Sequence, residues 1–125
     1  MKREALLGFA AAFLLLACQS APTSQPPQLA PFTTDVCSWS PDAPFGVDIS
    51  DICLAHDVAY HKGGSEELRL AVDMEFREGI AARGLPAYAR FAYRMVRIGG
   101  HPSNPLGHLG GYQWGYGWSD QWGYP

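Results

Sequence analysis

A histidine and an aspartate stand side by side in the middle of the chain, with a cysteine before them and a tyrosine after them. These residues are Cys53, His56, Asp57 and Tyr60. On a helix, neighbouring side chains point about 100° apart, so His56 and Asp57 cannot easily pair but can serve two tasks at one end of a cleft. An imidazole can take a proton from water, and a carboxylate suits a hard cation such as calcium. Tyr60, one turn later, can offer its hydroxyl to a buried partner.

Three helices are predicted to position these groups, each with signals at its ends. The first is capped by Asp48 or Ser50 and stops at Gly63-Gly64, the second starts at Ser65 and ends at Gly84, and the third opens at Pro86 and closes at Gly99-Gly100. Helical spacing then predicts three apolar faces. They are Ile49, Ile52, Cys53, His56, Ala59 and Tyr60; Leu68, Val72, Phe76 and Ile80; and Tyr88, Phe91, Ala92, Met95 and Val96. The fold class expected is therefore mainly α.

The N-terminal residues are predicted to form a targeting segment rather than part of the folded domain. Lys2 and Arg3 precede an uncharged apolar run from Leu6 to Leu16, which is too short for a membrane-spanning helix of about 20 residues and typical of a secretory signal. The run ends in Leu-Leu-Ala-Cys, which resembles the lipobox of bacterial lipoproteins. That resemblance implies a signal peptide over 1–17 and lipid on Cys18, whose acyl chains would anchor the protein to a membrane. An ordinary cleaved signal with a chance cysteine is the alternative.

Beyond Cys18 the sequence predicts a tether and one small domain. Residues 18–31 are polar and proline-rich, so they read as a semi-extended linker, and 32–125 form the domain. Gln19 is not the aspartate associated with inner-membrane retention in bacterial lipoproteins, so the resemblance implies a lipid-anchored protein of the cell envelope, in the outer membrane of a Gram-negative-type bacterium. A net charge of −3 argues against general nucleic-acid binding, and a phospholipid membrane is the expected partner.

The last part of the chain, 99–125, is rich in glycine, tryptophan and tyrosine and contains no Lys or Arg. Aromatic residues alternate with others at Tyr112, Trp114, Tyr116 and Trp118, which predicts a short extended segment with one aromatic face. We expect it to cover the small core. A membrane-interface contact is the alternative, although Trp39 is a better candidate for that role.

Two cysteines remain once Cys18 carries lipid. In an exported protein Cys37 and Cys53 are expected to form a disulfide, the alternative being two buried free thiols. The pattern Cys-x-x-His-Asp-x-x-Tyr-x-x-Gly that begins at Cys53, preceded by this loop, resembles the secreted phospholipase A₂ superfamily. The separation of the two cysteines matches the family's bridge between calcium loop and catalytic helix. Ala59, where many members have a second cysteine, is more similar to the compact bacterial and parvoviral branches.

The resemblance implies a role for each matching residue. His56 would be the general base that activates water, and Asp57 would bind calcium together with the backbone carbonyls near Val36, Ser38 and Ser40. The ion would polarise the ester carbonyl. A second aspartate on the next long helix, for which Asp73 is the candidate, would hold the far nitrogen of His56.

Two functional hypotheses follow. The first is a membrane-anchored, calcium-dependent hydrolase of phospholipid acyl esters. The calcium loop departs from the family, because Ser38, Ser40 and Pro41 stand where glycines are usual. The second hypothesis is a non-catalytic envelope lipoprotein whose aromatic tail binds a partner or a glycan. The stripe formed by Arg90, Arg94 and Arg97 reads either as a solvated face or as a contact with anionic headgroups.

Overall fold

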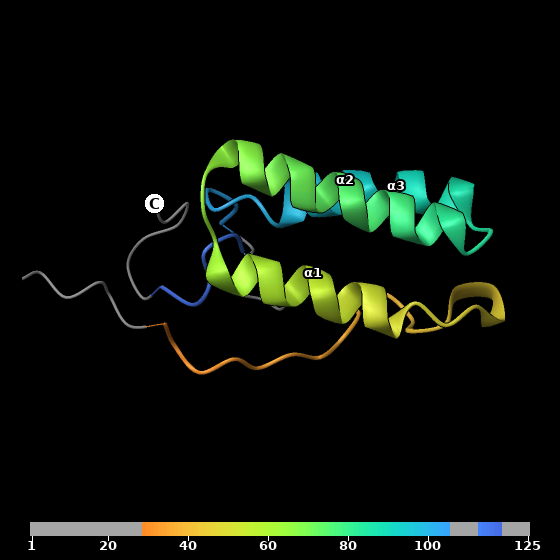
Figure 1. Cartoon of the computed structure of the whole chain (residues 1–125), viewed down its shortest axis with the longest axis horizontal. Helices are drawn as coiled ribbons and strands as arrows, with labels where there is room; N and C mark the ends of the chain where they lie inside the picture. The colour runs from red at the N-terminus through yellow and green to blue at the C-terminus, as the bar shows by residue number, and fades with distance from the viewer. Residues whose placement is uncertain (1–28, 106–112, 119–125) are drawn as a thin grey trace, which may run out of the picture.

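The computed structural model describes residues 29–105 and 113–118, and its regular structure there is entirely helical (Figure 1). A short 3₁₀ turn, η1 (Pro44–Gly46), precedes α1 (Ser50–Lys62), α2 (Glu66–Ala82) and α3 (Pro86–Gly99). The expected mainly α class is thus confirmed for the described part of the chain. None of the helices in these ranges is long and apolar enough to cross a membrane. The signal peptide, Cys18 and Tyr112 lie outside the described residues.

The helix ends lie where the sequence signals placed them. The Ser65 hydroxyl accepts a hydrogen bond from the Leu68 N–H at the start of α2, and Pro86 occupies the first turn of α3. At the start of α1 the N-cap residue is Ile49, and the Asp48 carboxylate accepts from the Ser50 N–H from outside the helix. Asp48 therefore binds the first N–H of the helix without being its N-cap residue. The predicted helix boundaries are confirmed.

The helix α2 packs against α3 and also contacts α1, which runs below the other two helices in the view (Figure 1). A core of buried apolar side chains joins the three helices and the loop before α1. It comprises Cys37, Ile49, Cys53, Phe76, Ile80, Ala89 and Ala92. The Cys37–Cys53 disulfide is confirmed, and it fastens the loop to α1 one turn before His56. The staple therefore fixes the loop relative to the helix that carries the chemical motif.

Two predicted apolar faces need correction. On α2 the buried side chains are Arg69, Asp73, Phe76 and Ile80, whereas Leu68 is 48% exposed. In the first half of α2 the side chains that face the core are thus Arg69 and Asp73, each one residue after the predicted Leu68 and Val72. Polar groups rather than apolar ones are buried there. On α3 only Ala89 and Ala92 are fully buried, because larger residues of the predicted face surround a cavity instead.

The tail segment 113–118 forms turns rather than the predicted extended segment. Gly115 has a positive φ of 77°, and its N–H donates to the Tyr60 carbonyl at the end of α1. Because the chain turns there, the aromatics do not share a face: Trp114 is buried and Tyr116 is half exposed. The Trp114 indole N–H donates to the Gly64 carbonyl at 2.8 Å. Trp114 thus belongs to the core, as expected of the tail.

Replacing Trp114 by alanine should therefore destabilise the fold strongly. The side chain is 1% exposed and packs edge-on against Tyr60 with ring centroids 5.1 Å apart. Loss of a buried aromatic of this size costs about 3–5 kcal/mol. The free energy of unfolding, measured by urea denaturation, would show this, whereas Tyr116→Ala at the half-exposed position should cost far less. Equal, small losses in both variants would mean that the tail does not pack on α1.

Candidate active site

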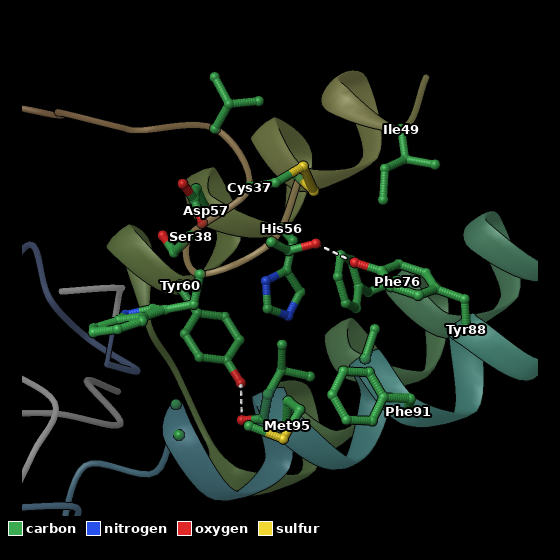
Figure 2. Close-up of a pocket in the computed structure, with 18 of the residues that line it drawn as sticks. Cys37, Ser38, Ile49, His56, Asp57, Tyr60, Phe76, Tyr88, Phe91 and Met95 are labelled. Carbon is green, nitrogen blue, oxygen red and sulfur yellow. Dashed lines mark hydrogen bonds between the residues drawn. A yellow bond between two sulfur atoms is a disulfide. The ribbon is translucent and has the colours of Figure 1, made fainter. Parts of the chain in front are cut away.

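A cavity of about 380 Å³ lies between α1 and α3 (Figure 2). Phe76 of α2 contributes to its wall, and the loop 36–40 forms part of its lining. Most of the lining is apolar, from Ile49, Phe76, Phe91, Ala92, Met95 and Val96. Only a few polar side chains reach the wall, and His56 and Asp57 are among them. An apolar hollow with a small number of polar groups is the usual form of a site for an apolar ligand.

The imidazole of His56 is fixed on three sides. Its ring lies between those of Tyr60 and Phe76, with both centroid distances 4.4 Å (Figure 2). Its Nε2 lies 2.8 Å from Oδ1 of Asp73. Because a carboxylate only accepts, Nε2 carries the proton and Nδ1 is left as the basic nitrogen. Within the described residues no group hydrogen-bonds to Nδ1. The structure thus brings Asp73 to the far nitrogen of His56.

Asp73 is fully buried and accepts hydrogen bonds at both carboxylate oxygens. The Tyr60 hydroxyl donates to Oδ1 at 2.7 Å, and Nη1 of Arg97 donates to Oδ2 at 2.7 Å. Burial alone would raise the pKa of Asp73, but the hydrogen bonds from His56, Tyr60 and Arg97 outweigh it and hold this pKa below its ordinary value. Burial also raises the pKa of Tyr60. Asp73 therefore stays an anion at neutral pH, and Tyr60 stays a hydrogen-bond donor.

The lowered pKa of Asp73 predicts a pH-dependent contribution to stability. A group whose pKa is lower in the folded state stabilises the fold above its unfolded pKa, and this contribution is lost as pH falls through the folded value. At pH 7 Asp73→Asn should lower the free energy of unfolding by about 3–5 kcal/mol, the usual cost of breaking a buried pair. Denaturation at several pH values should show this difference narrowing below about pH 4. A difference that stays constant into strong acid would contradict the assignment.

Asp57 lies at the other side of His56, against the loop before α1. It is 6% exposed, and Oδ2 accepts a hydrogen bond from the Thr34 hydroxyl at 2.6 Å. Burial raises the pKa of Asp57 to about 6, although Thr34 and His56 both act to lower it. Among the described residues no Lys or Arg forms an ion pair with this carboxylate. A buried carboxylate without a cationic side chain beside it suits a bound cation.

The serine hydroxyls of the loop before α1 are engaged by other side chains. The Ser38 hydroxyl donates to Asp35, and the Ser40 hydroxyl pairs with that of Tyr88. In the described part of the chain, no hydrogen bond reaches the carbonyls of Val36, Ser38 or Ser40. No group of three His, Cys, Asp or Glu side chains that could hold a metal occurs in 29–105 and 113–118. The buried carboxylate on this side of His56 is therefore that of Asp57, and the charge of Asp35 also acts on it.

Comparison with known proteins does not assign a family or a function to this site. No family model, no curated protein and no solved structure matches this chain. The resemblance to phospholipases A₂ remains an expectation drawn from the sequence pattern that begins at Cys53. What the structure shows is a three-helix fold with a Cys37–Cys53 staple and a histidine–aspartate pair beside an apolar cavity.

Several charged or polar side chains make contacts that the sequence did not predict. Arg97 was placed on an open arginine face, but its guanidinium binds Asp73 and Glu66. Arg69 is completely buried beside the same carboxylates; its spacing of four residues from Asp73 was the available signal. His61 is also buried, at 6% exposed, with its ring 5.3 Å from that of Phe32.

Proposed function

We propose that this protein is a calcium-dependent hydrolase of phospholipid acyl esters, with His56 as the general base. The observation that carries the proposal is the placement of His56. Its Nε2 is held by the buried Asp73 while the side chain lines an apolar cavity next to the buried carboxylate of Asp57. A base, an orienting carboxylate and a cation ligand are the groups that direct hydrolysis of an ester by water needs.

The proposed reaction uses no serine and no covalent intermediate. Nδ1 of His56 accepts a proton from a water molecule, whose oxygen attacks the ester carbonyl carbon. Asp73 stabilises the imidazolium that results. The imidazolium returns the proton to the alcohol oxygen as the carbon–oxygen bond breaks, which gives a fatty acid and an alcohol. Calcium, held by Asp57 and the carbonyls of Val36, Ser38 and Ser40, would supply positive charge for the developing oxyanion.

A phospholipid suits the shape and surface of the site. The cavity is apolar, so it can hold an acyl chain that leaves the bilayer. Large apolar side chains on its wall are also open to solvent: Trp39 is 82%, Phe91 59% and Met95 51% exposed. Arg90 and Arg94 are exposed on the same helix as the last two. Aromatic and apolar groups enter the lipid interface, and basic residues favour anionic headgroups.

The proposal places enzyme and substrate on one surface. A lipid anchor on Cys18 would hold the domain at the membrane, which raises the effective concentration of phospholipid at the cavity. In this account the protein works in the cell envelope, at the outer membrane.

Product analysis tests the proposal. Purified protein incubated with anionic phospholipid vesicles and calcium should produce free fatty acid and lysophospholipid in equal amounts, as measured by mass spectrometry. Vesicles of ether-linked phospholipid, which has no acyl ester, should yield neither product. If diacyl vesicles also remain intact in calcium, the chain is not a phospholipid hydrolase.

A further inference from the structure

We propose that Arg97 is a positioning residue for this reaction, acting through Asp73 on His56. The inference rests on the proposed function and extends it to a residue outside the cavity wall. Arg97 lies in the last turn of α3. One arm of its guanidinium, Nη1, donates to Asp73 Oδ2 at 2.7 Å, and the other, Nη2, donates to Glu66 Oε1 at 2.8 Å.

The two oxygens of Asp73 have separate partners. Oδ1 takes the hydrogen bonds from His56 and Tyr60, and both donors come from α1. Oδ2 takes the bond from Arg97 of α3. A carboxylate held at one oxygen can turn about its Cβ–Cγ bond, whereas one held at both cannot. Arg97 therefore fixes the direction in which Oδ1 meets Nε2, and with it the tautomer that leaves Nδ1 basic.

Arg97 is itself held in place by a second arginine. Arg69 is fully buried, and its Nη2 donates to the carbonyls of Val96 and Arg97 at 3.2 and 2.7 Å. Its Nη1 donates to Glu66 at 3.1 Å. Glu66 thus receives both arginines and ties the first turn of α2 to the last turn of α3. Arg69 lies farther from Asp73 than Arg97 does, at 4.0 Å, so Arg97 makes the direct contact.

Three variants distinguish a role of Arg97 in positioning Asp73 and His56 from a role in stabilising the fold. Arg97→Gln removes the guanidinium, Arg97→Lys keeps one charge, and Arg77→Gln is the matched control. Arg77 also joins α2 to α3, through the face of the Tyr93 ring at 5.0 Å, without touching Asp73. On phospholipid vesicles with calcium, Arg97→Gln should lower kcat by about 10- to 100-fold with KM unchanged, because Arg97 does not line the cavity. Arg97→Lys should restore part of the loss, and Arg77→Gln should match wild type.

A spectroscopic measurement tests the same inference without hydrolysis. Nitrogen-15 NMR of the His56 imidazole, assigned by comparison with His56→Gln, should show one tautomer with Nε2 protonated in wild type and Arg77→Gln. Arg97→Gln should give a mixture of tautomers. If Arg97→Gln gives this mixture of tautomers but the wild-type protein hydrolyses no phospholipid, the proposed function is overturned, while the positioning of His56 by Arg97 is retained. An active protein in which Arg97→Gln changes neither kcat nor the tautomer would overturn the inference.

If Arg97→Gln does not fold, the same kinetic and NMR measurements on Glu66→Gln test the role of Arg97. The Glu66 side chain is 46% exposed, so the variant should fold. It weakens the contact that holds one arm of Arg97, while the other arm can still donate to Asp73. A smaller fall in kcat at unchanged KM, with a detectable second tautomer of His56, is then expected. Unchanged kcat and a single tautomer would overturn the role of Arg97.

Discussion

His56→Gln is expected to reduce fatty-acid release from phospholipid vesicles by about 10²- to 10⁴-fold, the usual contribution of a general base. Glutamine has a similar reach and can donate its amide to the buried Asp73, so the fold should survive. It cannot take a proton from water, and no other imidazole lines the cavity wall formed by the described residues. The rate of release at saturating calcium measures the effect, and the thermal unfolding midpoint checks the fold.

The matched control for this variant is His101→Gln. His101 follows α3 and lies outside the cavity wall, so its replacement tests for a general effect of losing a histidine. Wild-type rates in His101→Gln, with the loss confined to His56→Gln, are the predicted pattern. Full activity in a folded His56→Gln protein would show that another group activates the water.

The second large effect is expected from Asp57→Asn. Asparagine has the same shape and can still accept the hydrogen bond from Thr34, but it brings no negative charge to the buried site. Calcium should raise the unfolding midpoint of wild type, by an amount equivalent to about 2.7 kcal/mol at a hundredfold excess over Kd, and should leave the variant unshifted. Hydrolysis should fall by about 10²- to 10³-fold, the cost of losing oxyanion stabilisation.

Asp51→Asn provides the comparison for that experiment. Asp51 is an exposed aspartate on the same helix, paired with Arg83, and its variant should keep the full calcium-induced shift. A shift retained in Asp57→Asn would mean that calcium binds elsewhere on the chain, and the ligand set around Val36, Ser38 and Ser40 would have to be abandoned.

Much of the helical framework could be predicted because its signals are local. Ser65 caps α2 through a bond to the third residue after it, and Pro86 marks the first turn of α3; both depend only on nearby residues. The Cys37–Cys53 bridge followed from the number of cysteines once Cys18 was set aside. These features need no knowledge of how the helices pack.

The parts that escaped prediction depend on packing between helices. The contact between Arg97 and Asp73 joins α3 to α2 across 24 positions of sequence, and no local pattern gives the register of two helices. The same lack of register made Leu68 rather than Arg69 the expected inward residue of α2. In the tail, the alternation predicted a short extended segment, but the chain turns at Gly115, whose N–H donates to the Tyr60 carbonyl at the end of α1.

The most direct test of the central claim is the rate at which the wild-type protein releases fatty acid from diacyl phospholipid vesicles, measured in calcium and again in excess chelator. The account predicts rapid release in calcium and almost none in chelator. Release that is absent under both conditions, or equal in both, would contradict an ester hydrolase in which His56 and Asp57 work together at this cavity.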